Sequence, residues 1–128
     1  MKYQSGPSGE ALDPVLKSFD RPDEVRTFAK GRFELVHLGG RTFGRATYQP
    51  GWRWSVDVGP GSGKRFCDVE HLGLVLSGRA TVAFADGRVT VLEPGTLFHV
   101  SSRPHDSWVV GDAPYVSLHF LGAETYAK

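Results

Sequence analysis

The chain has 128 residues, of which 40% are hydrophobic and 23% are charged, an ordinary balance for a globular protein with one domain. Lys and Arg number 15, and Asp and Glu number 14. This balance excludes the strong positive charge that nucleic-acid-binding and membrane-surface proteins usually carry. No stretch is apolar over the length of a bilayer. We therefore expect no nucleic-acid partner and no membrane association.

The compartment is indicated by two features of the sequence. The N-terminus lacks the apolar middle of a signal peptide. The one cysteine, Cys67, cannot form an internal disulfide. Together these features predict a cytoplasmic protein.

The first half of the chain predicts an N-terminal segment followed by short strands. Residues 1–11 are rich in Gly, Ser and Pro and predict a flexible segment, whereas residues 12–128 predict a single barrel domain. Short runs of β-branched and aromatic residues predict strands where Gly and Pro separate them; these runs are VRTFAK, RFELVHL, RTFGRATY and WRWSVDV. In WRWSVDV, large apolar residues alternate with polar ones, as in a strand with one buried face.

The second half continues the same pattern. GPGSGK predicts a loop, and the dipeptide Asp86–Gly87 predicts a tight hairpin between ATVAFA and RVTVLE. One strand, HLGLVLS, is predicted before this hairpin. Three more strands are predicted after it, namely TLFHV, HDSWVV and YVSLHF. With little helical periodicity and no long crossovers, the pattern predicts an all-β antiparallel sandwich or small barrel.

Two segments of the chain resemble the signature segments of the cupin superfamily. HLGLVLSGR, which closes at Gly78, resembles the end of the first signature. DGRVTVLEPGTLFHVSSRPH, with Pro94–Gly95 and His105, resembles the second. The resemblance covers residues 33–121 and implies a cupin-like antiparallel jelly-roll β-barrel. It also implies a small-molecule ligand in the barrel.

The ligand positions of the first signature depart from the usual cupin pattern. In the family, a His-x-His pair precedes a Glu, and this Glu lies seven residues before the closing glycine. Here His71 stands at the Glu position, and Cys67 and Arg65 stand where the two histidines are usual. The resemblance therefore implies a metal site of Cys67, His71 and His105, with Arg65 replacing one ligand.

The residue types of this set suit several metals. Thiolate and imidazole bind zinc, copper and iron well, and the pattern does not distinguish Zn, Fe, Cu, Ni and Mn as the divalent transition metal. In one straight strand, the Cα atoms of Cys67 and His71 would stand about 13 Å apart. The metal hypothesis therefore requires a turn or bulge at residues 68–70, where the resemblance implies a strand junction. Two alternatives stay open: a packed cysteine beside a hydrogen-bonded histidine, and a metal-free pocket in which Arg65 binds a carboxylate or phosphate.

Three further side chains are candidates for substrate binding. His119 shares one face of its predicted strand with polar neighbours, so it is a candidate fourth ligand or general base; the alternative is a histidine at the surface or core edge. Trp54 and Trp108 are candidates for packing on a ligand, with the ordinary core as the alternative. Asp106 is expected to fix a loop or cap a turn.

Two classes of function remain open. The first is a metal-dependent small-molecule enzyme of dioxygenase, isomerase or decarboxylase type. The second is a non-catalytic sensor or binding module with a degenerate metal site. Because HLGLVLS is apolar on both faces, we expect both to be covered and predict a homodimer, the commonest assembly. The alternative is a monomer in which residues 12–30 cover that surface.

Overall fold

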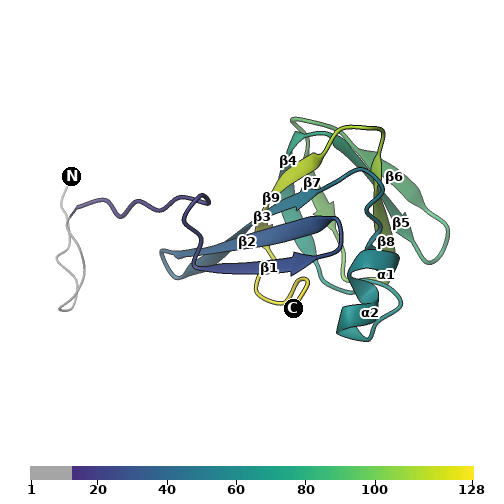
Figure 1. The fold of residues 1–128 in the computed structure, drawn as a ribbon, viewed down its shortest axis with the longest axis horizontal. Coiled ribbons are helices and arrows are strands. Elements are labelled where there is room, and N and C mark those ends of the chain that lie inside the picture. The colour runs from purple at the N-terminus through teal and green to yellow at the C-terminus, as the bar shows by residue number, and fades with distance from the viewer. Residues whose placement is uncertain (1–12) are drawn as a thin grey trace.

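The computed structural model describes residues 13–128. The expected flexible segment, residues 1–11, therefore lies outside the described residues. In the described part, two antiparallel sheets face each other and enclose the core (Figure 1). No helix of residues 13–128 is long and apolar enough to cross a membrane.

The larger sheet has six strands in the order β1-β2-β3-β9-β4-β7. Their bounds are Glu24–Phe28 for β1, Gly31–Leu38 for β2, Arg41–Tyr48 for β3, Tyr115–Leu121 for β9, His71–Ser77 for β4 and Leu97–Val100 for β7. The smaller sheet has the order β6-β5-β8, with bounds Val89–Leu92, Arg79–Phe84 and His105–Val110. The antiparallel jelly-roll barrel predicted from the sequence is confirmed.

The chain passes from the larger to the smaller sheet at Gly78, between β4 and β5. Gly78 has a φ of +71°, a conformation that L side chains rarely adopt. A Cβ atom here would lie 2.1 Å from the carbonyl oxygen of Pro114. This corner therefore admits only glycine, which accounts for the glycine that closes the first signature.

The segment WRWSVDV is not the strand that its alternation predicts. Residues Trp54–Asp57 form the helical turn α1, and Gly59–Ser62 form a second turn, α2. Two carboxylates stabilise α1. Asp57 accepts a hydrogen bond from the backbone N–H of Arg53 at 2.8 Å, and Asp106 accepts bonds from the backbone N–H and the hydroxyl of Ser55 at 2.9 and 2.7 Å. Asp106 thus fixes a turn, as expected.

The core lies between the sheets and is built from strand residues and from residues of the connecting segments. Its largest fully buried side chains are Phe33, Leu35, Trp52, Cys67, Val75 and Ser117. At one end of this core the buried residues include His71, His105 and His119. Burying polar groups without hydrogen-bond partners costs folding free energy. A group of buried histidines therefore indicates that this end of the barrel serves a function.

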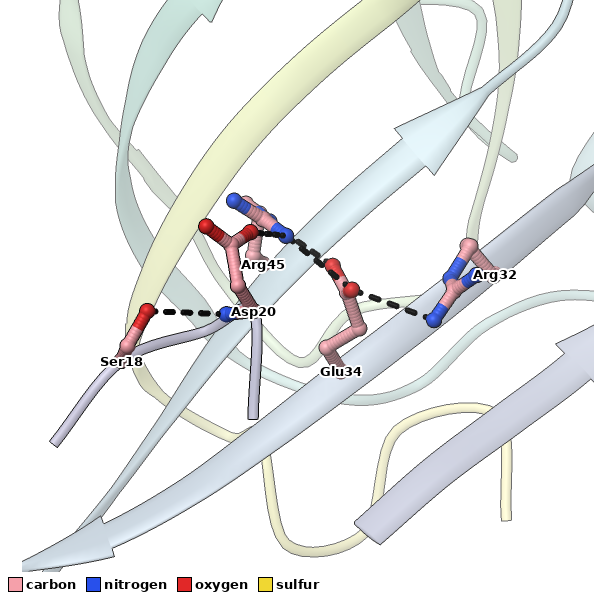
Figure 2. Close-up of polar contacts among 5 residues, drawn as sticks. All are labelled: Ser18, Asp20, Arg32, Glu34 and Arg45. Atoms are coloured by element: carbon pink, nitrogen blue, oxygen red, sulfur yellow. Dashed lines mark hydrogen bonds and ion pairs between the residues drawn. The ribbon is translucent and has the colours of Figure 1, made fainter. Parts of the chain in front are cut away.

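The outer face of β2 and β3 carries an ion network that holds the segment leading into β1. Glu34 accepts two hydrogen bonds from Arg45, at 2.7 and 3.0 Å, and pairs with Arg32 at 3.2 Å (Figure 2). Arg45 also bonds Asp20, and its guanidinium lies over the ring of Phe19. Bidentate Arg–carboxylate geometry is the strong form of this pair. The N-terminal approach, residues 18–23, therefore lies on β2 and β3.

Candidate metal centre

Three segments of the chain place the predicted ligands at one end of the barrel. His71 is the first residue of β4, and His105 is the first residue of β8. Cys67 precedes β4 and forms a backbone bridge with His105, with N···O distances of 2.8 and 3.0 Å. Residues 68–70 have no regular structure, so the required break between Cys67 and His71 is present.

One expectation about these residues is corrected. The sequence suggests that His71 and His105 lie on neighbouring strands. In the structure, β4 and β8 belong to different sheets that face each other. Both imidazoles still point inward and are buried, because each occupies an inward position at the start of its strand.

The ligand atoms of the three residues converge. The Cys67 sulfur, one nitrogen of His71 and one nitrogen of His105 all lie within 4.8 Å of one another. The Cys67 Sγ and the His71 Nε2 atoms are 3.6 Å apart. The metal hypothesis predicts ligand atoms within about 4 Å of one another, because first-shell bonds are about 2.0–2.3 Å long, and the observed spread is wider. An ion bound by all three residues would therefore require their ligand atoms to move closer together.

The tautomer of His105 is set by the backbone. Its Nδ1 atom lies 2.7 Å from the carbonyl oxygen of Arg103. A carbonyl oxygen only accepts, so Nδ1 carries the proton and donates it. The Nε2 atom is then an unprotonated acceptor, and it is buried with no protein partner. Metal-binding histidines are typically held by such a bond through their second nitrogen, so His105 fits the role of a ligand.

Burial keeps the centre uncharged when no metal is bound. It raises the pKa of the Cys67 thiol to about 12. It also lowers the pKa of His105 and, together with the neighbouring His119 and His105, lowers the pKa of His71 well below its usual value. Imidazoles must be neutral to bind a metal and a cysteine must give up its proton, so the two histidines are in the required state at neutral pH.

His119 on β9 lies beside the three ligands without joining them. Its ring centroid is 5.5 Å from that of His71, and its Nε2 atom is 3.0 Å from the hydroxyl of Ser117. Its Nδ1 atom is buried with no protein partner. Burial lowers its pKa to about 4. His119 is therefore a neutral interior imidazole with one free nitrogen, rather than a surface histidine.

A small cavity adjoins these residues. Its free space is about 40 Å³, room for roughly three water molecules. The walls combine the four polar residues of this end with aromatic and aliphatic side chains; they include Cys67, His71, His105, His119, Trp54, Tyr48, Tyr126, Phe98 and Val100. No Lys or Arg side chain is among the lining residues of this cavity.

Two predicted substrate-binding residues are not among the residues that line the cavity. Arg65 is exposed, and its guanidinium lies 5.3 Å from the ring of Phe66. Trp108 is partly buried, with the guanidinium of Arg53 4.2 Å from its ring. The backbone of the 64–67 segment leads into the Cys67 bridge, and this turns Arg65 outward. Trp54 and His119 do line the cavity.

Tyr126 is the site residue that sequence reasoning missed. It is buried, its ring centroid lies 5.2 Å from that of His71, and its hydroxyl is 2.5 Å from the hydroxyl of Tyr48. The surrounding sequence, ETYAK, has no strand pattern and no motif that would place it in the barrel. Its aromatic side chain near the chain end was the one available signal.

Comparisons with known proteins identify the fold. No protein-family model and no curated protein sequence matches the chain. Solved structures do match: a sugar phosphate isomerase from a cupin superfamily of Silicibacter pomeroyi has 16% identity and a TM-score of 0.58, covering 83% of this chain and 73% of its own. A Klebsiella pneumoniae protein with a double-stranded β-helix domain has 15% identity and a TM-score of 0.57, covering 88% and 93%.

A third structure extends the comparison to a larger enzyme. It is the formate complex of Lactobacillus farciminis oxalate decarboxylase, with 16% identity and a TM-score of 0.55. The match covers 77% of this chain but only 30% of the decarboxylase. At such identities the comparisons concern the fold alone, and they show that the chain has a double-stranded β-helix fold like that of these structures.

Proposed function

We propose that this cupin-fold protein is a metal-dependent enzyme acting on a small molecule, with Cys67, His71 and His105 as the metal ligands. One observation carries the proposal. Three ligand atoms from separate segments converge to within 4.8 Å in the barrel interior, and the Nε2 atom of His105 has no protein partner. Three protein ligands beside a cavity correspond to the open arrangement of catalytic zinc sites rather than to closed structural sites.

The chemistry would be divided between the metal and the chain. When bound, the metal would supply a Lewis acid that polarises a carbonyl group or activates a water molecule. The Arg103 carbonyl holds His105 in the tautomer that presents Nε2. His119, neutral and with a free Nδ1 atom, would accept a proton or a hydrogen bond from a bound molecule. An isomerase that removes a proton next to a carbonyl group needs this combination of an electrophile and a proton acceptor.

The metal content of protein purified without added metal tests the proposal. We expect about one transition metal per chain, because the three residues form one site. His71→Ala and His105→Ala should each remove it. His99→Ala and His37→Ala are matched controls, because both side chains are exposed and bond Glu70 and Thr42 instead; both variants should keep the metal.

A thermal measurement gives an independent result. Because a ligand bound only by the folded state stabilises it, a chelator should lower the melting temperature of the wild type by several degrees. It should leave the His71→Ala melting temperature unchanged. Metal-free wild-type protein that takes up no added metal and shows no chelator effect would contradict the proposal.

A second candidate is a sensor or binding module, favoured by one observation. The free space beside the ligands is about 40 Å³, enough for a small molecule's head group and not for a large substrate. Loading the metal-bound protein with pools of small molecules separates the candidates. Thermal stabilisation with the compound recovered unchanged supports a binding module, whereas conversion of the compound supports the enzyme.

A further inference from the structure

The residues that follow β9 contribute Tyr126 to the wall of the cavity. Residues 122–128 form a turn in which Ala123 and Tyr126 are buried. The amides of Thr125 and Tyr126 donate to the carbonyl oxygen of Gly122 at 3.4 and 3.2 Å. Figure 1 shows this segment, in yellow, beside β1. We call residues 122–128 the lid segment.

One arginine holds the lid segment. Arg26 on β1 donates from Nη1 to the carbonyl oxygens of Ala123 and Tyr126, at 3.1 and 2.6 Å, and from Nη2 to that of Glu124, at 3.0 Å. Glu24 accepts from its Nε atom at 2.7 Å. Carbonyl groups at the end of a helical turn lack partners within the turn, and a guanidinium fork satisfies several at once. Arg26 is thus the main polar connection between the barrel and the lid segment.

The lid segment places one side chain in the barrel. The ring of Tyr126 contacts those of Phe33 and His71, at centroid distances of 4.9 and 5.2 Å, and stacks on His119 at 6.0 Å. Its hydroxyl bonds that of Tyr48. One side chain therefore forms the wall of the cavity beside a candidate ligand.

A surface groove lies on the other side of this wall. The groove measures about 270 Å³ and is lined by Lys64, Asp68, Thr125 and neighbouring residues. The groove and the cavity share three lining residues, Trp54, Cys67 and Tyr126. Withdrawal of Tyr126 would therefore join the two spaces and open the ligands to the surface.

We propose that the lid segment is a movable gate of the cavity, that Arg26 is its latch, and that Tyr126 is the wall withdrawn when a small molecule enters. This proposal rests on the proposed function, because it assumes that a small molecule must enter this cavity. A space of about 40 Å³ admits little more than water, whereas the joined space accommodates a metabolite-sized molecule. Every latch bond is accepted by a backbone carbonyl of the lid segment, so none of these bonds depends on the side chains of that segment.

The single cysteine reports on the gate without any activity assay. Cys67 is buried behind Tyr126 and lines both spaces, so its labelling by a small thiol reagent measures opening. In metal-free protein prepared with a chelator, Arg26→Ala should speed the labelling of Cys67 about tenfold or more. A tenfold change corresponds to lowering the free energy of opening the lid segment by ~1.4 kcal/mol. Arg32→Ala, which removes an exposed arginine of β2 that bonds Glu34 instead, should label at the wild-type rate.

A second variant keeps the proposal testable if Arg26→Ala weakens the whole fold. Tyr126→Phe retains the latch and the ring and removes only the hydroxyl bond to Tyr48, so it should speed labelling by a smaller factor. Hydrogen exchange should show faster exchange of the Thr125 and Tyr126 amides in both variants, with the β4 and β9 amides unchanged. Wild-type labelling rates in both variants would overturn the gate. This outcome is independent of metal content, so the gate and the metal centre can fail separately.

Discussion

The corner between β4 and β5 requires a glycine at one residue, Gly78. Its φ is positive, and the carbonyl oxygen of Pro114 occupies the space that a side chain would need. Gly87, in the predicted Asp86–Gly87 hairpin, also has a positive φ, but nothing lies within 4 Å of its Cβ position. Substitutions at the two glycines therefore differ in one respect: both meet the cost of a left-handed backbone, and only the one at Gly78 also meets a steric clash.

We expect Gly78→Ala to lower the free energy of unfolding by about 3 kcal/mol or more, because left-handed strain and a backbone clash add. Gly87→Ala should lower it by only about 1–2 kcal/mol, the cost of the left-handed conformation alone. Urea denaturation of the two variants measures the difference. Equal losses in both would contradict the role given to the Pro114 carbonyl.

The candidate ligands could be predicted because their residue types stand at the ligand positions of a motif. Cys67, His71 and His105 are such residues, and the break at residues 68–70 followed from the length of a strand. The inward position of His119 was one of two open alternatives, and only the structure decides it. Arg65, predicted to bind substrate, is exposed and is not among the residues that line the cavity, because the motif gives its place in the chain and not the direction of its side chain.

α1 shows at the scale of one element how tertiary contacts override a sequence pattern. Alternation in WRWSVDV predicts a strand, and Trp52 does pair through its carbonyl oxygen with the amide of Val109. The pattern is broken by Asp106, 51 residues away from Ser55, whose carboxylate accepts both the amide and the hydroxyl of Ser55. Such a distant acceptor leaves no local signal. The strands of the sheets, in contrast, are marked by local runs and turns, and these were predicted.

We expect Asp106→Ala to lower the free energy of unfolding by about 3 kcal/mol, because several donors lose a charged acceptor in a largely buried place. The donors are the amides of Ser55 and Ser107, the hydroxyl of Ser55 and the guanidinium of Arg53. Urea denaturation followed by the fluorescence of the three tryptophans checks this. Asp112→Ala, at an exposed position before β9, should cost little; a similar loss in both would refute the role of Asp106.

In the whole molecule, as far as residues 13–128 describe it, one outer face of the barrel is exposed. The N-terminal approach lies on β2 and β3, where Asp20 bonds Arg45, and the described part of it does not cover β4 and β7. Several outward residues of this face are apolar and exposed, beside the exposed His99 that bonds Glu70; the apolar ones include Leu72, Leu76, Leu97 and Phe120. The homodimer expected from the two-sided apolar strand therefore has a candidate surface in the β9-β4-β7 face.

We propose a dimer through this face, and sedimentation tests it. At micromolar concentration we expect a mass of twice 14.0 kDa. Leu97→Glu should give the mass of a single chain, because a charge would be buried without a partner. Val56→Glu, at an exposed position on α1, should leave the dimer intact. Wild-type protein that sediments at 14.0 kDa would show that the face serves another purpose.

The position of β9 has a consequence for how the protein is made. It lies in the larger sheet between β3 and β4 and pairs with both, yet a ribosome synthesises it after every other strand. Until then, the hairpins of β1–β3 and the segments from β4 to β8 each present an unpaired edge, and such edges favour aggregation. Joining them requires contacts between residues far apart in sequence, which slow folding. A nascent chain stopped before Tyr115 should therefore depend on chaperones, because the larger sheet closes only once β9 is available.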